Sequence, residues 1–463
     1  MHNDTESPFS LTLTQSDLQL QVLRLNGREA LNQPYHFDLE LISLGPPISA
    51  DALLGQPAFL RLDGKSGVHG VLQSVSLSAD ASSRIGYHLT LVPYLQRLEQ
   101  GPRRRVFHRL SVVEVLRRLL EEHALPPDSY RFELPHGHYP CRPFCIQYEE
   151  SDLTLLQRLC EEEGIHYHFE HAFQGHVLVF AEDPKSFAAH PVELPLRPDN
   201  DRQPALQRLY QRHHSTLPGL PFRFRDRAGE RSDDTAANQV FAEAAHEMIR
   251  ADTAQAYRFQ ASRRNLERLR CQQRQIHGHS THPALHSGQI VQIGDHPLTV
   301  FNDQWLVTEI QHQGRQFSIL EPNLPATPPS TDYRNRFTAI AWSTVFRPGL
   351  RHPRPCIPGY HLAHVLGTTG QPAQLDEHGR VSVSLWTPGQ EGLALPVSQQ
   401  RLGEPPRLMA GSEVLVSFLD GDPDRPVLCA QPSTPDTGQG PARPRHNHDT
   451  GLLFDWLLNP PAP

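Results

Sequence analysis

Residues 411–429 constrain the fold of this chain most strongly, because their pattern predicts two short strands joined by a tight turn. Val414, Val416 and Phe418 recur at every second position, which is the period of a strand buried mainly on one face. Gly421 follows an aspartate, and glycine accepts the positive φ that a tight turn needs. Residues 427–429 then form the returning strand.

A second hairpin is predicted upstream, over residues 376–386. It turns at His378-Gly379 and directs Val381, Val383 and Leu385 inward. Several short strands with turn signals within about 65 residues are typical of a small closed β-barrel of the OB type.

These hairpins resemble part of a known family. Residues 376–386, 411–418 and 421–426 are similar to the OB-fold core of the VgrG (TssI) spike proteins of type VI secretion systems. The shared order of all the motifs makes the match specific, and it covers residues 10 to about 432. The further motifs lie at residues 25–41, 54–58, 145–153, 159–165, 333–340 and 346–348.

The resemblance implies a mainly β protein with α+β insertions, in which two β-barrel tube domains, like those of phage tail hubs, precede the OB-fold barrel. The implied divisions are a first tube barrel (1–95), an inserted α+β module (96–185), a second tube barrel with helices (186–341), a linker (342–370), the OB barrel (371–432) and a flexible tail with an apolar tip (433–463).

The residue pattern itself predicts antiparallel strands in residues 8–95. Phe37, Leu39 and Leu41 alternate with polar residues, which indicates one packed face and one wet face. A turn is expected at Asn26-Gly27, before this strand.

Two helices have clear start or stop signals. Ser111 and Glu114 fit a capping box that opens a helix over residues 111–123. A second helix is expected over residues 151–163, with Cys160 inward and Gly164 as the stop.

A helical pattern begins at Asp234, and a third helix is expected within residues 255–275. Leu266, Leu269 and Tyr257 would form its inner stripe. Its basic side chains are predicted to be a solvated face, and the resemblance implies a helix on the outside of the second barrel. They are Arg258, Arg263, Arg264, Arg268 and Arg270.

Composition disfavours several classes of protein. The net charge of -8 argues against a general nucleic-acid binder. The first residues lack a secretory signal pattern, and the apolar runs are too short for a membrane helix, so no stable membrane insertion is expected. Six scattered cysteines indicate a reducing compartment. We therefore expect a bacterial cytoplasmic protein before firing, which the type VI apparatus exports without a signal peptide.

Catalytic motifs are missing from the sequence. There is no Gly-x-Ser-x-Gly elbow and no phosphate-binding Gly-x-x-x-x-Gly-Lys-Ser/Thr loop. His246-Glu247 has Arg250 where a zinc protease would have its second histidine. The prediction is a protein that is not an enzyme and needs no cofactor.

Two histidine-rich clusters have ligand types that suit zinc. The first is His136, His138, Cys141 and Cys145, but Cys145 begins an expected strand and can point to the core. The second is His277, His279, His282 and His286, in a loop expected between a helix and a strand. With 28 histidines in the chain, chance clustering is the expected explanation, and no metal is predicted.

Nucleic-acid binding by the OB barrel is also not expected. OB folds that bind single strands combine exposed aromatic residues with a basic groove. This barrel offers Trp386, but it carries many acidic residues. They are Asp376, Glu377, Asp420, Asp422 and Asp424.

The predicted function is a structural spike subunit. The resemblance implies a homotrimer that caps the hexameric Hcp tube, contacts baseplate proteins and carries an effector, adaptor or PAAR-like tip protein through the OB barrel or the tail. Exposing the apolar tail together would be costly, so it is expected to dock on its own trimer or on a partner. The tail residues are Leu452, Leu453, Phe454, Trp456 and Leu457.

One departure from the family is expected. Family members usually continue into a long trimeric β-helix needle, whereas about 30 residues follow this OB barrel, too few for such a stack of repeats. Membrane piercing is therefore not expected of this short form. Two alternatives stay open, namely the hub of a phage tail or other contractile injection system, and a metal-binding or degenerate enzymatic protein.

Overall fold

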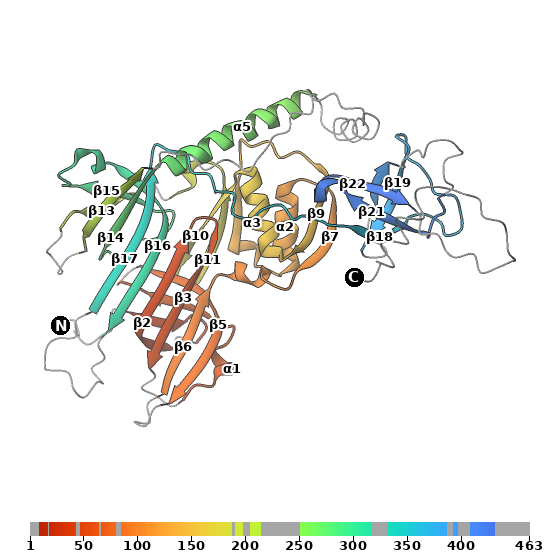
Figure 1. The fold of residues 1–463 in the computed structure, drawn as a ribbon. Coiled ribbons are helices and arrows are strands. Elements are labelled where there is room, and N and C mark those ends of the chain that lie inside the picture. Colours follow the sequence, from red (N-terminus) through yellow and green to blue (C-terminus); the bar gives the residue numbers. More distant parts are fainter. Residues whose placement is uncertain are drawn as a thin grey trace, which may run out of the picture.

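The fold was analysed in a computed structural model. The structure describes residues 9–16, 18–42, 47–63, 66–79, 85–187, 190–197, 204–213, 251–316, 331–386, 392–396 and 408–430. Two β-barrels lie side by side at one end, an α+β module lies beside them, and a small β-barrel forms the other end (Figure 1).

The first barrel is closed by six antiparallel strands in the order β1-β4-β5-β6-β3-β2, with β2 pairing back to β1. Its leucines and aromatic residues fill one continuous core. The elements are β1 (Ser10–Leu13), β2 (Gln19–Ala30), β3 (Gln33–Ile42), α1 (Ala50–Leu53), β4 (Pro57–Arg61), β5 (Gly67–Ala79) and β6 (Ile85–Val92).

The expected turn at Asn26-Gly27 is wrong. Both residues lie inside β2, and Gly27 pairs with Phe37 of β3. A Cβ atom added to Gly27 would lie 2.1 Å from Cε1 of Phe37, so glycine is required by a ring that covers the backbone. The chain turns instead at Leu31-Asn32, where Asn32 has a φ of 59°.

The second barrel repeats this design. Its strands run β12-β15-β16-β17-β14-β13, and a single parallel bridge between Leu196 and Leu206 nearly closes the ring. Gly278 lies under the ring of Phe337 as Gly27 lies under Phe37. The elements are β12 (Val192–Pro195), β13 (Leu206–His213), β14 (Arg274–Ser280), β15 (Ile290–Gly294), η4 (Thr299–Phe301), β16 (Gln304–Gln316) and β17 (Thr331–Ala341).

The two barrels share one wall. β16 pairs with β2 over seven residue pairs, from Glu309 opposite Ala30 to Arg315 opposite Arg24. A single 12-stranded sheet therefore runs through both barrels, as the adjacent strands in Figure 1 show. The barrels form one unit, because neither can be removed without exposing a long strand edge of the other.

The module contains the two helices with clear sequence signals. The capping box of Ser111 and Glu114 is present, and Gly164 ends α3 with a φ of 67°, so both predictions are confirmed. Cys160 is fully buried, also as predicted. The elements are η1 (Tyr94–Leu98), β7 (Arg103–Leu110), α2 (Val112–Glu122), η2 (Pro127–Ser129), β8 (Tyr130–Glu133), β9 (Arg142–Glu150), α3 (Asp152–Glu163), β10 (His166–Ala172), β11 (Gly175–Ala181) and η3 (Pro184–Ser186).

The third barrel is a five-stranded antiparallel sheet in the order β20-β19-β18-β21-β22, whose outer strands β20 and β22 contact each other. The predicted hairpins are confirmed, with Val414, Val416 and Phe418 buried. The elements are β18 (Tyr360–Val365), β19 (Arg380–Leu385), β20 (Leu393–Pro396), β21 (Glu413–Phe418), η5 (Leu419–Gly421) and β22 (Pro426–Ala430).

The predicted start of this barrel is too late in the chain. β18 lies within the stretch expected to be a linker, and Ile357 already belongs to the barrel core. His361 and His364 interrupt the apolar pattern of this strand, so the alternation of apolar residues does not predict it. The same core includes Val106 of β7 and Ile146 of β9, so the module's two-stranded sheet covers one side of the barrel.

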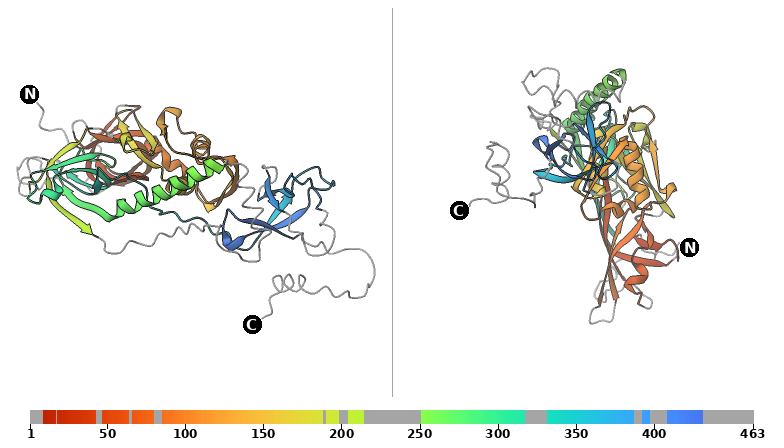
Figure 2. Two further views of the ribbon diagram at one scale, coloured as in Figure 1. Left: turned by 90° about the horizontal axis from the view of Figure 1, so that it is seen from above. Right: turned by 90° about the vertical axis from the view of Figure 1, so that its right-hand side faces the viewer.

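The helix α5 (Ala251–Gln273) leads into β14 and runs along the outside of the module (Figures 1 and 2). The helical pattern expected from Asp234 onward falls partly on residues 234–250, which lie outside the described residues. Within the described part of the chain, no helix combines the length and apolar character needed to cross a membrane.

Candidate functional site

The helix α3 ends in three consecutive glutamates that contact different parts of the chain. Glu161 accepts hydrogen bonds from the backbone nitrogens of Arg351 (2.8 Å) and His352 (2.9 Å), and from Nδ1 of His352 (2.8 Å). It therefore anchors the segment that connects the second barrel to the OB barrel.

Glu162 links the module to the OB barrel through arginines. It lies 3.1 Å from Arg158, 3.3 Å from Arg142 and 3.0 Å from Arg354, and Arg354 also contacts Asp424 at 2.6 Å. Burial alone would raise the pKa of Glu162, but Arg354, Arg142 and Arg158 lower it to about 2. This carboxylate therefore stays ionised in a nearly water-free position.

Glu163 links α3 to α5. Its carboxylate lies 2.8 Å from Arg142 and 3.5 Å from Arg264, and it accepts a hydrogen bond from the Tyr257 hydroxyl (2.9 Å). Arg264 also reaches Glu182, whose carboxylate accepts the backbone nitrogens of His136 and Gly137. The loop before β9 is thereby tied to α5.

Arg347 joins three elements from its position after β17. It contacts Glu267 of α5 at 2.7 Å and donates to the carbonyl oxygens of Gly164 (3.2 Å) and Glu182 (2.6 Å). The motifs at residues 159–165 and 346–348, which the sequence separates by almost 200 positions, therefore meet here. We call the set Glu161, Glu162, Glu163, Arg142, Arg158, Arg264, Arg268 and Arg347 the ionic junction.

The predicted orientation of α5 is partly wrong. Tyr257 faces inward and Arg258, Arg263 and Arg270 are exposed, as predicted, but the helix buries two arginines and exposes a leucine. Arg264 and Arg268 are 3% and 2% exposed, whereas Leu266 is 57% exposed. Arg268 donates to the carbonyl oxygens of Pro348 (2.7 Å) and Glu161 (2.6 Å). The inner face of the helix is therefore ionic, because the surface that it covers presents carboxylates and carbonyl oxygens rather than apolar side chains.

A smaller ionic cluster holds the start of α3. Asp152 is fully buried and accepts from Arg105 (2.8 Å) and from Nε2 of His123 (2.7 Å), with Arg103 at 3.2 Å. Burial opposes ionisation, but these contacts lower the pKa of Asp152. Arg103 and Arg105 thus fasten β7 to α3.

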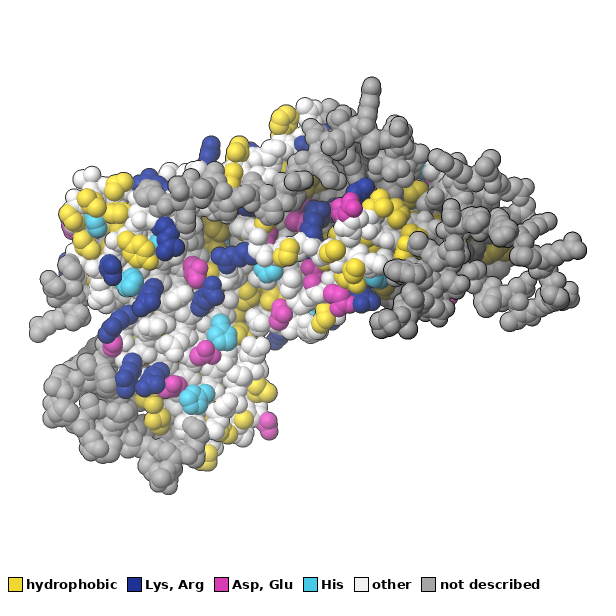
Figure 3. Space-filling model, in the orientation of Figure 1, with side chains coloured by type: hydrophobic (Ala, Val, Ile, Leu, Met, Phe, Trp, Pro, Cys, Tyr) yellow, Lys and Arg dark blue, Asp and Glu magenta, His cyan; other side chains and the backbone are white. Residues whose placement is uncertain are grey.

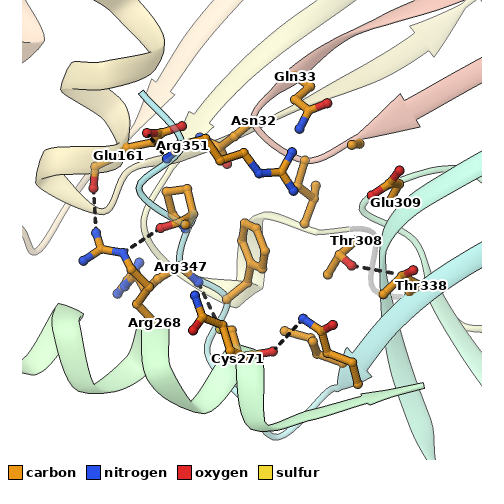
Figure 4. Close-up of a pocket in the computed structure, with 18 of the residues that line it drawn as sticks. Asn32, Gln33, Glu161, Arg268, Cys271, Thr308, Glu309, Thr338, Arg347 and Arg351 are labelled. Carbon is orange, nitrogen blue, oxygen red and sulfur yellow. Dashed lines mark hydrogen bonds between the residues drawn. The ribbon is translucent and has the colours of Figure 1, made fainter. Parts of the chain in front are cut away.

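A cavity of about 400 Å³ lies between the ionic junction and the shared wall of the barrels (Figure 4). Arg268, Arg347 and Cys271 line it, together with Thr308 and Thr338. Burial raises the pKa of the Cys271 thiol to about 11, and its sulfur bonds to the backbone at Val345 and Arg347. It is therefore a protonated structural thiol and not an activated nucleophile.

The first histidine–cysteine cluster is not assembled. Cys145 is buried in β9, 5% exposed, and belongs to the module's core, as expected, although the strand begins earlier than predicted, at Arg142. Cys141 is exposed, and its Sγ lies 3.8 Å from the neighbouring carbonyl oxygen of Arg142. His136 and His138 use their backbone nitrogens to bind Glu182 and Gln260.

The second cluster is also dispersed, and its expected place in a loop is partly wrong. His277 and His279 lie in β14, where Nδ1 of His277 contacts Thr338 Oγ1 at 3.1 Å. His282 and His286 lie in the loop before β15, and His286 contacts Glu29 at 3.0 Å. Among the residues that the structure describes, no group of three or more metal-ligating side chains is suitably arranged.

The other predicted sites give mixed outcomes. Trp386 donates to Nδ1 of His361 at 3.2 Å and lies against Tyr148 of β9, so its ring is engaged at a domain contact. Acidic and basic side chains are interspersed on the described face in Figure 3. The apolar tail residues Leu452, Leu453, Phe454, Trp456 and Leu457 lie outside the described residues.

The arrangement ties separate segments of the chain together. Removing one partner of a buried ion pair typically costs about 3–5 kcal/mol, so each member of the ionic junction holds the others in place. The motifs at residues 159–165 and 346–348 are each recognisable in the sequence, but the sequence does not show that they meet. The sequence signal for the ionic junction is the run of three glutamates before Gly164, because a solvent-exposed helix end does not require three consecutive carboxylates.

Comparisons with known proteins agree with this architecture. The family model of the phage tail baseplate hub (GPD) matches residues 28–317. The type VI secretion system spike protein VgrG5 of Pseudomonas aeruginosa is 38% identical over 460 residues, which cover 91% of this chain and 57% of that protein. The chain therefore spans little more than half the length of this relative.

Solved structures show the same fold. An Escherichia coli component of the type VI secretion system, described as similar to the T4 tail proteins gp27 and gp5, superposes with a TM-score of 0.67. It is 24% identical, and the match covers 89% of this chain and 97% of that one. A chain of the Francisella PdpA–VgrG complex gives a TM-score of 0.57 at 8% identity, covering 94% of this chain and 72% of that one. The two barrels with a shared wall and the match to the family model together show that this chain belongs to the phage tail baseplate hub family, and its sequence is similar to that of VgrG spike proteins.

Proposed function

We propose that this protein is a structural subunit of a type VI secretion spike, which assembles as a homotrimer and caps the hexameric Hcp tube. The shared wall of the two barrels carries the proposal. Three chains would supply six barrels of repeated design, matching the sixfold symmetry of a hexameric ring. The ionic junction would then keep the OB barrel fixed relative to that ring.

The partners follow from the same proposal. Baseplate proteins would contact the barrels from outside. An effector, adaptor or PAAR-like tip protein would dock on the OB barrel or on the apolar tail. The solved Francisella complex, whose name pairs PdpA with VgrG, supports partner binding by this fold. Before firing the protein would reside in the bacterial cytoplasm, and the apparatus would export it without a signal peptide.

We further propose that this chain is not itself an enzyme. The cavity in Figure 4 is lined by arginines that are already bonded and by a protonated thiol. Its polar groups hold neighbouring segments together. The proposal extends to these 463 residues only, because the match covers 57% of the relative VgrG5.

Light scattering of the purified chain, followed by co-sedimentation with assembled Hcp rings, tests the proposal. A mass of three chains and binding of one trimer per ring end are expected. A chain that stays monomeric and fails to bind Hcp rings at micromolar concentration would contradict it.

A phage tail hub is the second candidate, because the matching family model is named for phage baseplates. Binding to a phage tail tube protein, with none to Hcp rings, would favour it.

The role of the apolar tail is tested by a pull-down that compares the full chain with a chain in which Leu453, Phe454 and Trp456 are replaced by serine. Equal recovery of tip or effector proteins would exclude the tail as their docking segment.

A further inference from the structure

Five histidines and one glutamate meet where the first barrel, the module and the second barrel touch. The hairpin β10–β11 of the module packs on β5 of the first barrel, and the loop before β15 approaches from the second. We call this set the histidine seam. Its members are His69 (β5), His171 (β10), His176 (β11), His286 (the loop before β15), His312 (β16) and Glu29 (β2).

Backbone donors fix the proton positions in part of the seam. The backbone N–H of Tyr94 donates to Nε2 of His176 at 3.1 Å, so this nitrogen carries no proton. A neutral His176 therefore carries its proton on Nδ1. That nitrogen lies 3.0 Å from Nδ1 of His69, which must act as the acceptor. The proton of His69 is then on Nε2, which has no hydrogen-bond partner among the described residues.

His171 is constrained in the same way. The backbone N–H of His69 donates to Nδ1 of His171 at 3.3 Å, so this nitrogen is also unprotonated. All three histidines are neutral, and each unprotonated nitrogen already accepts a hydrogen bond. Adding a proton to His69 or His171 therefore breaks a contact between the hairpin and β5 of the first barrel, and adding one to His176 breaks the contact between the hairpin and η1.

We propose that the histidine seam is an acid-operated release, in which proton uptake by His69, His171 and His176 detaches the hairpin β10–β11 from β5 and from the start of η1. One proton on His69 places two N–H groups opposite each other at 3.0 Å. One proton on His176 or His171 displaces the backbone donor of Tyr94 or His69. The release would open one contact surface and leave the ionic junction closed.

The remaining groups around the seam do not neutralise the added charge. Glu29, the carboxylate of the seam, is already shared by His286 at 3.0 Å and His312 at 3.1 Å, and it accepts a hydrogen bond from the backbone N–H of Ser287. Its own pKa is lowered despite burial, so it is ionised and fully engaged. The pKa of His286 is raised beside Glu29, which offsets the opposing effect of burial and favours a positive charge there.

The other titratable groups at the seam are tyrosines and more distant charges. Tyr35 donates to the carbonyl oxygen of His69, and Tyr333 contacts Nδ1 of His312. Burial raises the pKa of both hydroxyls, so neither takes up charge in acid. Arg97 and Asp128 lie near Tyr94, and Asp63 lies near His282.

The direction of the pH response follows from burial. Burial lowers the pKa of His69 from 6.5 to about 4 and that of His171 to about 3, and it also lowers that of His176. Histidines that stay neutral when closed stabilise the closed form fully above pH 6.5 and progressively less as the pH falls. At pH 4.5, His69 alone would favour opening roughly 10²-fold over pH 7.5.

Hydrogen exchange of the full chain, followed by mass spectrometry at pH 7.5 and 4.5 and corrected for the intrinsic rate, tests the proposal. Peptides covering residues 166–181, 67–79 and 93–98 should exchange more than about 10²-fold faster at pH 4.5, because His171 and His176 add to the effect of His69. Peptides from α3 should keep their protection, because Glu162 stays ionised down to a pH of about 2. Equal protection of the hairpin at both pH values would overturn the proposal, as would simultaneous loss of protection in α3.

Matched variants separate the seam from general acid sensitivity. Glutamine can accept and donate as His176 does and can accept as His171 does, but it cannot take up a proton. The double variant H171Q/H176Q should therefore lose at least tenfold of the pH effect. His88→Gln, at an exposed position of β6, should respond as the parent does.

If the double variant does not fold, exchange at the histidine C2 positions of the parent protein gives the answer. Midpoints near pH 4 for His69 and near pH 3 for His171 are expected. Midpoints near 6.5 would show that the seam takes up protons without opening, and would overturn the proposal.

Discussion

At the scale of single residues, this protein uses buried charge where many proteins use apolar packing. Arg158 is almost fully buried and bridges Glu150 at 2.6 Å and Glu162 at 3.1 Å. Such a pair is costly to desolvate, but it has strict geometry, and its members cannot be removed singly without leaving an unpaired charge. The ionic junction therefore fixes the relative orientation of elements that could shift against each other across an apolar contact.

Arg158→Ala should lower the free energy of unfolding by about 3–5 kcal/mol, because it leaves the buried carboxylate of Glu150 unpaired and removes one of the three arginines that contact Glu162. Arg118→Ala is the matched control, since Arg118 pairs with Glu122 in the same module but is 59% exposed. That change should cost no more than about 0.5 kcal/mol. Urea unfolding of the three proteins measures the difference, and equal midpoints would contradict this view of the junction.

Gly27→Ala should destabilise the first barrel by about 1–3 kcal/mol, because the new methyl group would overlap the ring of Phe37. Gly175→Ala, in the hairpin of the module, should be nearly neutral, since nothing lies within 4 Å of the added carbon. Thermal unfolding compares the two. A neutral Gly27→Ala would mean that the ring and strand can shift without loss.

At the scale of elements, local signals predicted what local interactions determine. The capping box of Ser111 and the left-handed Gly164 depend on neighbours within five residues, and both helices were predicted correctly. The inner face of α5 depends on carboxylates and carbonyl oxygens supplied from distant parts of the chain. The apolar pattern of the sequence therefore predicts Leu266 on the inner face of the helix, where the structure has Arg268.

The two faces of α5 should respond differently to substitution. Arg268→Ala should cost about 3 kcal/mol, because it removes hydrogen bonds to Pro348 and Glu161 and leaves a void. Leu266→Ala should change stability by at most about 0.5 kcal/mol, because the side chain is 57% exposed. Chemical denaturation measures both. A larger effect for Leu266 would restore the orientation predicted from the sequence.

At the scale of the whole molecule, the resemblance predicted the barrel class and the order of domains in outline. It could not predict the shared wall, because the pairing of Glu309 with Ala30 joins strands that are almost 280 positions apart. β18 was missed for a different reason, since its histidines break the apolar alternation. The histidine seam was missed because its members come from five separate strands and one loop.

Acid should weaken the molecule in two stages, first at the histidine seam and then, at lower pH, at the ionic junction. Glu162 has a lowered pKa of about 2 when folded, so its contribution is complete above pH 4.5 and is lost as the pH falls toward 2. Roughly 2 kcal/mol of that contribution should disappear between pH 6 and pH 3. Glu162→Gln should be less stable at pH 6 and should lose less stability on acidification. Parallel acid dependence in both proteins would exclude this role.

The shared wall also determines how the protein would carry force. In the β2–β16 contact, seven residue pairs lie side by side along two antiparallel strands. A push along the strand direction loads all their hydrogen bonds together, in shear, whereas a pull across the strands would break them one after another. The two barrels should therefore resist sliding past each other far better than they resist peeling apart. A thrust along the strands would be transmitted from one barrel to the other without a hinge.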